Sequence, residues 1–180
     1  GSCRVPFTTG ILVGIGETRE EIVASLFALA DLQRRWGHIQ EVIVQNFRAK
    51  AGTPMGSSAE PTPQFLARVV AVARWVLGAE MNLQSPPNLT ERFEVCLAAG
   101  VNDWGGVSPF TIDWVNPDQP WPHLDELAPR TEAAGFRLQA RLPVYPEFIG
   151  QRWIDDGLLA KLLDCVDERG CPRRQAGALG

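Results

Sequence analysis

Short apolar runs alternate with amphipathic stretches along the first part of the chain. Residues 7–13 are apolar and β-rich, and after a glycine loop Ile22, Leu26 and Leu29 recur at helical spacing. Because parallel strands need a crossover connection, strands that alternate with helices predict β/α units on a parallel sheet. The predicted strands are 7–13, 41–47, 81–84 and 101–104.

Capping residues set the expected limits of the helices. Thr18 and Glu21 have the spacing of a capping box, Thr62 precedes a first-turn proline, and Thr90 stands in the same position before a third helix. Glycines close these helices, as at Gly100. The resulting predictions are helices at 18–37, 62–78, 90–99, 124–134 and 158–166, a strand-like segment at 136–142 and a disordered tail over 170–180.

Composition narrows the class of protein. The 180 residues are 45% hydrophobic and 21% charged, which is typical of a globular domain. With 17 basic and 21 acidic side chains and no basic run, nucleic acid is not expected as a partner. The apolar run at 10–16 is too short to span a membrane, so we expect no membrane association and a cytoplasmic location.

The four cysteines do not form a metal motif. Cys3, Cys96, Cys165 and Cys171 lack the close spacing of zinc or iron-sulfur ligands, so no metal site is predicted in this chain. Cys96 falls in the apolar pattern of a helix and is expected in the core.

A glycine-rich turn follows the first predicted strand. Gly10, Leu12, Gly14, Gly16 and Glu17 lie at its carboxyl end. A dinucleotide fingerprint would need a third glycine where an arginine stands, and an acidic residue would face the pyrophosphate. Physical reasoning alone leaves two interpretations open, a tight β/α turn or close approach of a flat ligand to the backbone.

The chain resembles radical S-adenosylmethionine (SAM) enzymes. Gly10-x-Leu12-x-Gly14-x-x-Glu17 is similar to the glycine motif on the fifth barrel strand of that superfamily, which packs near the SAM adenine. Within the superfamily the longest similarity is to the FO synthase family, from about residue 5 to 153. It rests on the blocks 37–50, 86–89 (Pro-Pro-Asn-Leu), 102–109 (Asn-Asp-Trp-Gly-Gly-Val-Ser-Pro) and 141–146 (Arg-Leu-Pro-Val-Tyr-Pro).

The resemblance implies an α/β fold, a partial (β/α) barrel of roughly strands 5 to 8 with their helices. Residues 1–153 would form this C-terminal half, with a terminal helix at 154–169. In the family, three cysteines upstream of the glycine motif hold a [4Fe-4S] cluster. The missing N-terminal barrel half is therefore expected to supply the cluster, and this chain alone is expected to be inactive.

The resemblance also implies a reaction and its cofactors. SAM would contact Gly10, Leu12, Gly14, Gly16 and Glu17. The substrate would be 5-amino-5-(4-hydroxybenzyl)-6-(D-ribitylimino)-5,6-dihydrouracil, from which a 5'-deoxyadenosyl radical abstracts hydrogen before ring closure and release of ammonia. The product, the deazaflavin FO, is the chromophore of coenzyme F-420.

Polar residues at strand ends are the candidate substrate contacts, because active sites of barrels gather there. Gln45 and Asn46 end the second strand and can offer donors and acceptors to a uracil edge or to ribityl hydroxyls. Asp103 could accept a proton or simply stabilise a turn. Gln84, Asn88 and Asn102 occupy the corresponding ends of the later strands.

Two other functions remain open from the sequence. The chain could be a non-catalytic half-barrel that binds a small molecule or a partner protein. It could also belong to another radical SAM branch, such as the partner transferase of the tyrosine fragment or a biotin-synthase-like enzyme. The Asn102–Gly106 block favours the ring-closing branch.

Overall fold

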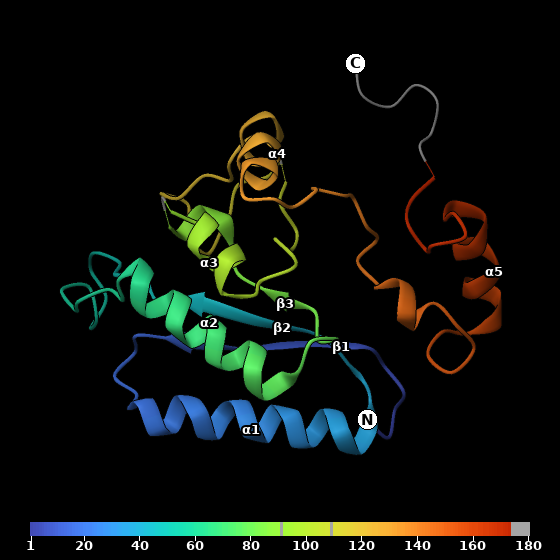
Figure 1. The fold of residues 1–180 in the computed structure, drawn as a ribbon, viewed down its shortest axis with the longest axis horizontal. Helices are drawn as coiled ribbons and strands as arrows, with labels where there is room; N and C mark the ends of the chain where they lie inside the picture. The colour runs from blue at the N-terminus through green and yellow to red at the C-terminus, as the bar shows by residue number, and fades with distance from the viewer. Residues whose placement is uncertain (91, 109, 174–180) are drawn as a thin grey trace.

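Three parallel strands form the sheet of the computed structural model, which describes residues 1–90, 92–108 and 110–173 (Figure 1). Strand β1 (Phe7–Val13) pairs with β2 (Ile39–Asn46), and β2 pairs with the short β3 (Leu83–Gln84), giving the order β1-β2-β3. The register sets Val13 opposite Asn46, so the two longer strands end together. The α/β class with a parallel sheet is confirmed, and it is compatible with part of a barrel.

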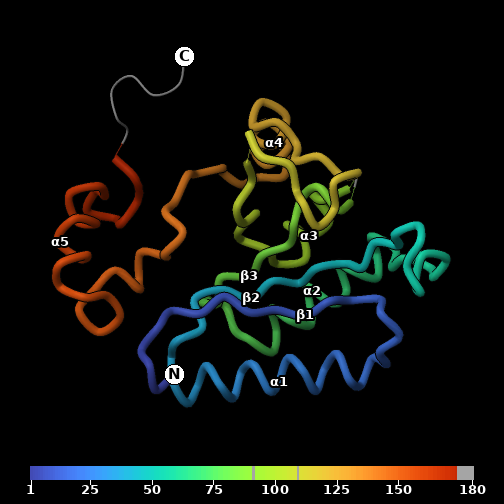
Figure 2. The backbone as a smooth tube through the Cα atoms, turned by 180° about the vertical axis from the view of Figure 1, so that it is seen from behind, coloured from blue at the N-terminus to red at the C-terminus, as the bar shows by residue number. Residues whose placement is uncertain are grey.

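Two long helices cover one face of this sheet, as Figures 1 and 2 show. Helix α1 (Arg19–Trp36) begins with the predicted capping box of Thr18 and Glu21. Helix α2 (Pro63–Leu77) begins after Thr62, whose hydroxyl accepts a hydrogen bond from the Phe65 amide. Their buried side chains form one hydrophobic core with the strands, including Leu26, Leu66, Val70, Val42 and Val44.

The other face of the sheet carries different residues. Because side chains alternate along a strand, Glu41, Ile43 and Gln45 point away from the helices that bury Val42 and Val44. Their neighbours in β1 are Thr8, Gly10 and Leu12. We call this surface the inner face.

The third β/α unit differs from its prediction. Residues Pro87–Leu89 form a 3-10 turn and helix α3 runs only from Glu94 to Ala99, so Thr90 does not cap it. The expected fourth strand at 101–104 is reduced to a single parallel bridge between Asp103 and Gln84. A strand of two residues offers too short an edge for a longer ladder.

The C-terminal third contains helices and an extended segment, residues 136–145, which we call the C-terminal strap. Helices α4 (Leu124–Ala133) and α5 (Asp156–Cys165) confirm their predictions, and Pro146–Phe148 is a second 3-10 turn. The predicted strand at 136–142 is wrong: this segment is extended but joins no ladder, and side-chain bonds attach it to the inner face instead. In Figure 1, α5 lies well apart from the sheet.

The predicted tail falls partly outside the described residues, which end at Arg173. Within them, Pro172 bridges to Val166 and the Arg173 amide donates to the Cys165 carbonyl, so the first residues of that tail are hydrogen-bonded. Cys96 is fully buried, as predicted. Across the described residues, no helix combines the length and apolarity that a membrane span needs.

Candidate functional site

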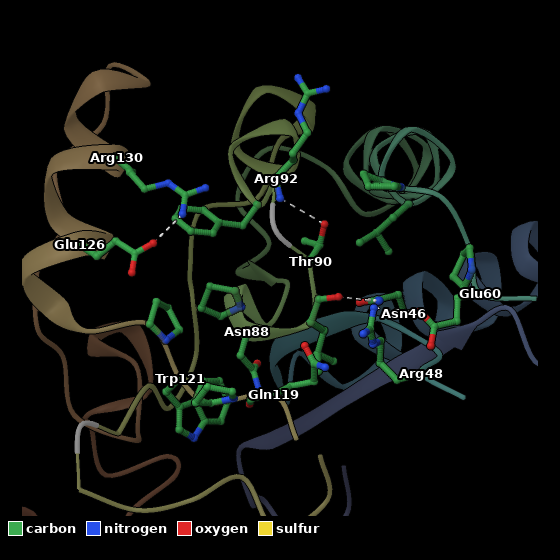
Figure 3. Close-up of a pocket in the computed structure, with 18 of the residues that line it drawn as sticks. Asn46, Arg48, Glu60, Asn88, Thr90, Arg92, Gln119, Trp121, Glu126 and Arg130 are labelled. Atoms are coloured by element: carbon green, nitrogen blue, oxygen red, sulfur yellow. Dashed lines mark hydrogen bonds and ion pairs between the residues drawn. The ribbon is translucent and has the colours of Figure 1, made fainter. Parts of the chain in front are cut away.

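Two adjoining cavities open where the strands end. The strand-end cavity, of about 370 Å³, lies at the carboxyl ends of β1 and β2 and is lined by residues that include Leu12, Gln45 and Lys50. The helix-side cavity, of about 650 Å³, lies between the end of β2, the start of α2 and helix α4 (Figure 3). Asn46 and Arg48 line both, so the two cavities lie next to each other.

The strand-end cavity brings together two predicted contacts. Leu12, a candidate for the cofactor, is 42% exposed, and Gln45, a candidate for the substrate, is partly buried beside it in register. Its far wall comes from Val115 and Asn116, whose loop is fixed by a hydrogen bond from Lys50 Nζ to the Val115 carbonyl. An apolar and an amide side chain thus face one space at the end of the sheet.

The glycine turn is held closed by its own acidic residue. The Glu17 carboxylate accepts hydrogen bonds from the amides of Gly14 (2.6 Å) and Ile15 (2.8 Å). Gly14 and Gly16 have φ values of 99° and 108°, which favour glycine. The amides of Gly14 and Ile15 are therefore not free to bind a ligand, whereas Leu12 and the 47% exposed Ile15 present apolar surface.

Gly10 has a different reason to be glycine. A Cβ at this position would stand 2.2 Å from the Ile43 carbonyl oxygen of the neighbouring strand. Close strand packing, rather than space for a ligand, therefore requires glycine at position 10.

The adjacent amides Gln45 and Asn46 face different surroundings. Gln45 belongs to the inner face, whereas Asn46 is 4% exposed and donates from Nδ2 to the Leu89 carbonyl at 3.0 Å. Its Oδ1 is buried without a hydrogen-bond partner. Asn46 thus presents an unused acceptor in the wall that both cavities share.

Asn88 repeats this arrangement in the helix-side cavity. Its Nδ2 donates to Asp113 Oδ2 (3.0 Å) and to the Gln119 carbonyl (2.9 Å), while its Oδ1 is buried and unpartnered. Burial alone would raise the pKa of Asp113, but hydrogen bonds from Asn116 and Asn88 hold it below its ordinary value. Asn46 and Asn88, both predicted as substrate contacts, therefore each have a buried Oδ1 atom that accepts no hydrogen bond from the protein.

Charged and aromatic side chains line the rest of the helix-side cavity. Arg48 pairs with Glu60 at 2.8 Å, and Arg130 pairs with Glu126 at 2.8 Å. Trp121 lies in the wall between Pro120 and Pro122 in sequence, and Figure 3 labels the tryptophan. The four charged residues were not predicted from the sequence, because only the fold brings 48–63 beside 119–130.

A partly buried ionic network occupies the amino-end half of the inner face. Arg141, from the C-terminal strap, binds Asp103 (Nε to Oδ2, 2.5 Å) and Glu41 (2.9 Å). Tyr145 donates to the same Glu41 oxygen at 2.7 Å. The Gln84 amide, with its nitrogen turned toward Glu41, donates at 2.9 and 3.3 Å.

This network changes the acidity of its members. Burial raises the pKa of Glu41 above its ordinary value, although Tyr145 and Arg141 oppose the change. Burial, Asp103 and Glu41 together raise the pKa of Tyr145. Burial by itself would lower the pKa of Arg141, but its hydrogen bonds and charge interaction with Asp103 raise that pKa above its ordinary value. The phenol and the guanidinium are therefore held protonated.

Asp103, predicted as a catalytic group, is a member of this network. Its oxygens accept from Arg141 and from the Gly105 amide, the latter at 2.5 Å. Gln84 lies beside it, but the structure does not bring Asn102 to either cavity. Asn102 Oδ1 accepts from the Leu83 amide (2.7 Å) and from Arg74 (3.0 Å), which joins β3 to α2.

Sequence reasoning missed Glu41, Arg141 and Tyr145 as one group. A usable signal existed for Glu41, because an acidic residue within an apolar strand must find partners when the sheet forms. No spacing rule links it to a strap a hundred positions later.

A cluster of metal ligands is not found among the described residues. No group of three or more His, Cys, Asp or Glu side chains lies close enough to hold an ion. The side chains of the described ranges therefore do not fit a [4Fe-4S] cluster, which needs several thiolates at one point.

Curated proteins similar to this chain cover nearly all of it. It is 51% identical over 174 residues to the 7,8-didemethyl-8-hydroxy-5-deazariboflavin synthase of Methanopyrus kandleri and 48% identical over 165 residues to that of Methanocaldococcus jannaschii. It is 50% identical over 180 residues to the FO synthase of Streptomyces coelicolor. The chain spans about half the length of the first two relatives (52% and 46%) and 21% of the third. No protein-family profile and no solved structure matches.

Proposed function

We propose that this chain, a relative of the FO synthases over almost its entire length, works as part of an enzyme that forms FO (7,8-didemethyl-8-hydroxy-5-deazariboflavin) for coenzyme F-420. The observation that carries the proposal is sequence identity of 51% over 96% of the chain to a synthase named for this product. The reaction would be a radical SAM carbon–nitrogen lyase step, which closes a ring and releases ammonia.

The proposed place of the chain in the enzyme is the C-terminal half of a (β/α) barrel, roughly strands 5 to 8. The sheet supports this assignment because both long helices cover one face and polar residues such as Glu41 and Gln45 lie on the other. In a closed barrel the second face would be the interior. The N-terminal half of the barrel would then supply the cluster ligands.

The proposed SAM contact is the surface formed by Leu12 and the turn from Gly14 to Glu17. When bound, SAM supplies the radical that abstracts hydrogen from the substrate. Glu17 fixes the turn through two amide hydrogen bonds, and Leu12 offers apolar area beside it. These residues would orient the adenine and exclude water from it.

The proposed substrate contacts are the amides around the two cavities. Gln45 would face a ligand in the strand-end cavity, and Asn46 and Asn88 would accept hydrogen bonds from it through Oδ1, because their Nδ2 atoms already donate to the protein. Gln84 lies deeper, against Glu41. Asp103 would act as a positioning residue, since both of its oxygens are already bonded within the network.

A chimera tests this function. The matching 174 residues of the Methanopyrus kandleri relative are replaced by this chain, and SAM-dependent formation of FO from the proposed adduct is followed anaerobically. We expect the chimera to form FO. Absence of FO from a folded, cluster-loaded chimera, under conditions in which the unmodified relative is active, would refute the proposal.

Matched glutamine variants of the chimera test the substrate contact. Gln45→Leu should raise the KM for the adduct roughly three- to tenfold, the effect of one lost hydrogen bond. Gln64→Leu replaces an exposed glutamine in the first turn of α2 that lines neither cavity, and should leave KM unchanged.

A further inference from the structure

The helix-side cavity contains acceptors that the protein itself does not satisfy. Asn46 is 4% and Asn88 9% exposed, and the Oδ1 atom of each is buried without a hydrogen-bond partner. A buried polar atom without a partner costs free energy, so such atoms favour a ligand that supplies donors. Both amide nitrogens already donate to the protein, which fixes the two oxygens as acceptors.

Two of the three arginines that line this cavity are paired with carboxylates. Arg48 is paired with Glu60, and Arg130 with both Glu126 and Glu94. The hydrogen bond from Arg130 lowers the pKa of Glu94 below its ordinary value, and the charge of Arg92 contributes a smaller lowering. Glu94 therefore stays ionised beside Arg130. The third arginine, Arg92, is exposed, and its side chain points away from the other lining residues in Figure 3. A wall whose other two arginines are paired with carboxylates has little net attraction for an anion such as a phosphate.

An aromatic wall completes the site. Trp121 and its neighbours Pro120 and Pro122 line the cavity, and Figure 3 shows Trp121 near Gln119 and Asn88. Tryptophan beside amides is an arrangement suited to a hydroxylated carbon chain, whose C–H groups contact the ring while its hydroxyls reach the amides.

From these observations we infer that the helix-side cavity binds a neutral polyhydroxyl chain through the Asn46 and Asn88 oxygens and the Trp121 ring. Because Asn46 and Arg48 also line the strand-end cavity, a ligand whose reacting part lies there can extend into this one. The inference deepens the proposed function and rests on it for the identity of the ligand, a substrate with a ribityl chain. Trp121, Asn46 and Asn88 then determine specificity for that chain.

The test uses the 180-residue chain and ribitol as the probe, with binding followed by saturation-transfer NMR, which detects weak complexes. Ribitol should bind to the parent chain. Trp121→Ala should raise the dissociation constant for ribitol roughly three- to tenfold, the effect of a lost aromatic contact. Trp114→Ala is the matched control, because Trp114 is 82% exposed and does not line either cavity.

A second variant and a second probe complete the experiment. Asn88→Leu, checked for folding by circular dichroism, should also weaken ribitol binding, and ribose 5-phosphate should not bind more tightly than ribitol. No ribitol signal, equal effects of the two tryptophan variants, or clear preference for the phosphate would each overturn the inference. The assay needs neither SAM nor cluster, so its failure is distinct from failure of the chimera to form FO.

Discussion

Gly10 and Glu17 show how the glycine motif is used at the level of single residues. Gly10 packs its α-carbon against the Ile43 carbonyl, and Glu17 binds the amides of the turn. Both roles stabilise the first β/α unit whether or not a ligand is present. Within the motif, Leu12 is the side chain that lines the strand-end cavity.

Gly10→Ala should therefore destabilise the fold. The new methyl group would stand 2.2 Å from a backbone oxygen, which the paired strand cannot move away from cheaply. We expect a loss of about 2 kcal/mol or more in the free energy of unfolding, measured with urea. Gly106→Ala is the control, since a Cβ there meets nothing within 4 Å, and a similar loss in both variants would contradict this explanation.

Glu41 should give the stability a pH dependence of unusual sign. Burial raises its pKa above the ordinary 4.5, so the folded chain binds this proton more tightly than the unfolded chain does. The contribution of the group to stability is then fully present below 4.5 and is lost as pH rises through the folded-state pKa.

Unfolding measurements on Glu41→Gln check this sign. The free energy of unfolding of the parent minus that of the variant should fall as pH rises from about 4 to about 7. Asp113→Asn provides the opposite case. Because the pKa of Asp113 is lowered in the folded chain, its contribution to the free energy of unfolding is lost as pH falls. A parent-minus-variant difference for Glu41 that rises with pH would show that Arg141 outweighs burial.

At the level of elements, the C-terminal strap is attached to the inner face by side chains rather than by strand pairing. Arg141 reaches both Glu41 of β2 and Asp103 beside β3, and its guanidinium lies 4.0 Å from the centre of the Tyr145 ring. These contacts close the amino-end half of the inner face. The ligand space is thereby confined to the carboxyl ends of the strands.

Arg141→Leu should loosen this attachment. It leaves two partly buried carboxylates without their cation, and removing one partner of such a group costs about 3 kcal/mol. Urea unfolding measures the change, with Arg34→Ala as control, because the Arg34–Asp31 pair is exposed and contributes less than about 1 kcal/mol. Equal losses in the two variants would mean that the network does not anchor the strap.

At the scale of the whole molecule, the sheet has helices on one face and polar contacts on the other. Strand β1 forms one edge of the three-stranded sheet and β3 the other. Figure 2 shows both long helices on one side, with the strap and α5 away from them. This arrangement suits a half-barrel whose second half contributes the remaining strands.

The isolated chain should not assemble an iron-sulfur cluster. The described residues contain no group of three His, Cys, Asp or Glu side chains near one point, and buried Cys96 has a thiol pKa raised by burial. Anaerobic reconstitution with iron and sulfide should give no stoichiometric cluster absorbance and no 5'-deoxyadenosine from SAM. The unmodified Methanopyrus kandleri relative, treated in parallel, should give both.

Most of the local structure was predictable from the sequence. Caps and apolar spacing located β1, α1, β2 and α2, because these signals act within a few residues. The strand predicted at 136–142 failed because alternation describes side chains and does not guarantee a partner strand.

By itself, then, the sequence determined the β/α order, the buried position of Cys96 and the resemblance to the FO synthases, since each depends on neighbouring residues or on linear motifs. Only the tertiary structure decided which amide oxygens lack partners, that Asn102 joins β3 to α2, and that Glu41 meets Arg141. The physical reason is that hydrogen bonding and burial depend on distances between segments, and local patterns along a chain do not fix those distances.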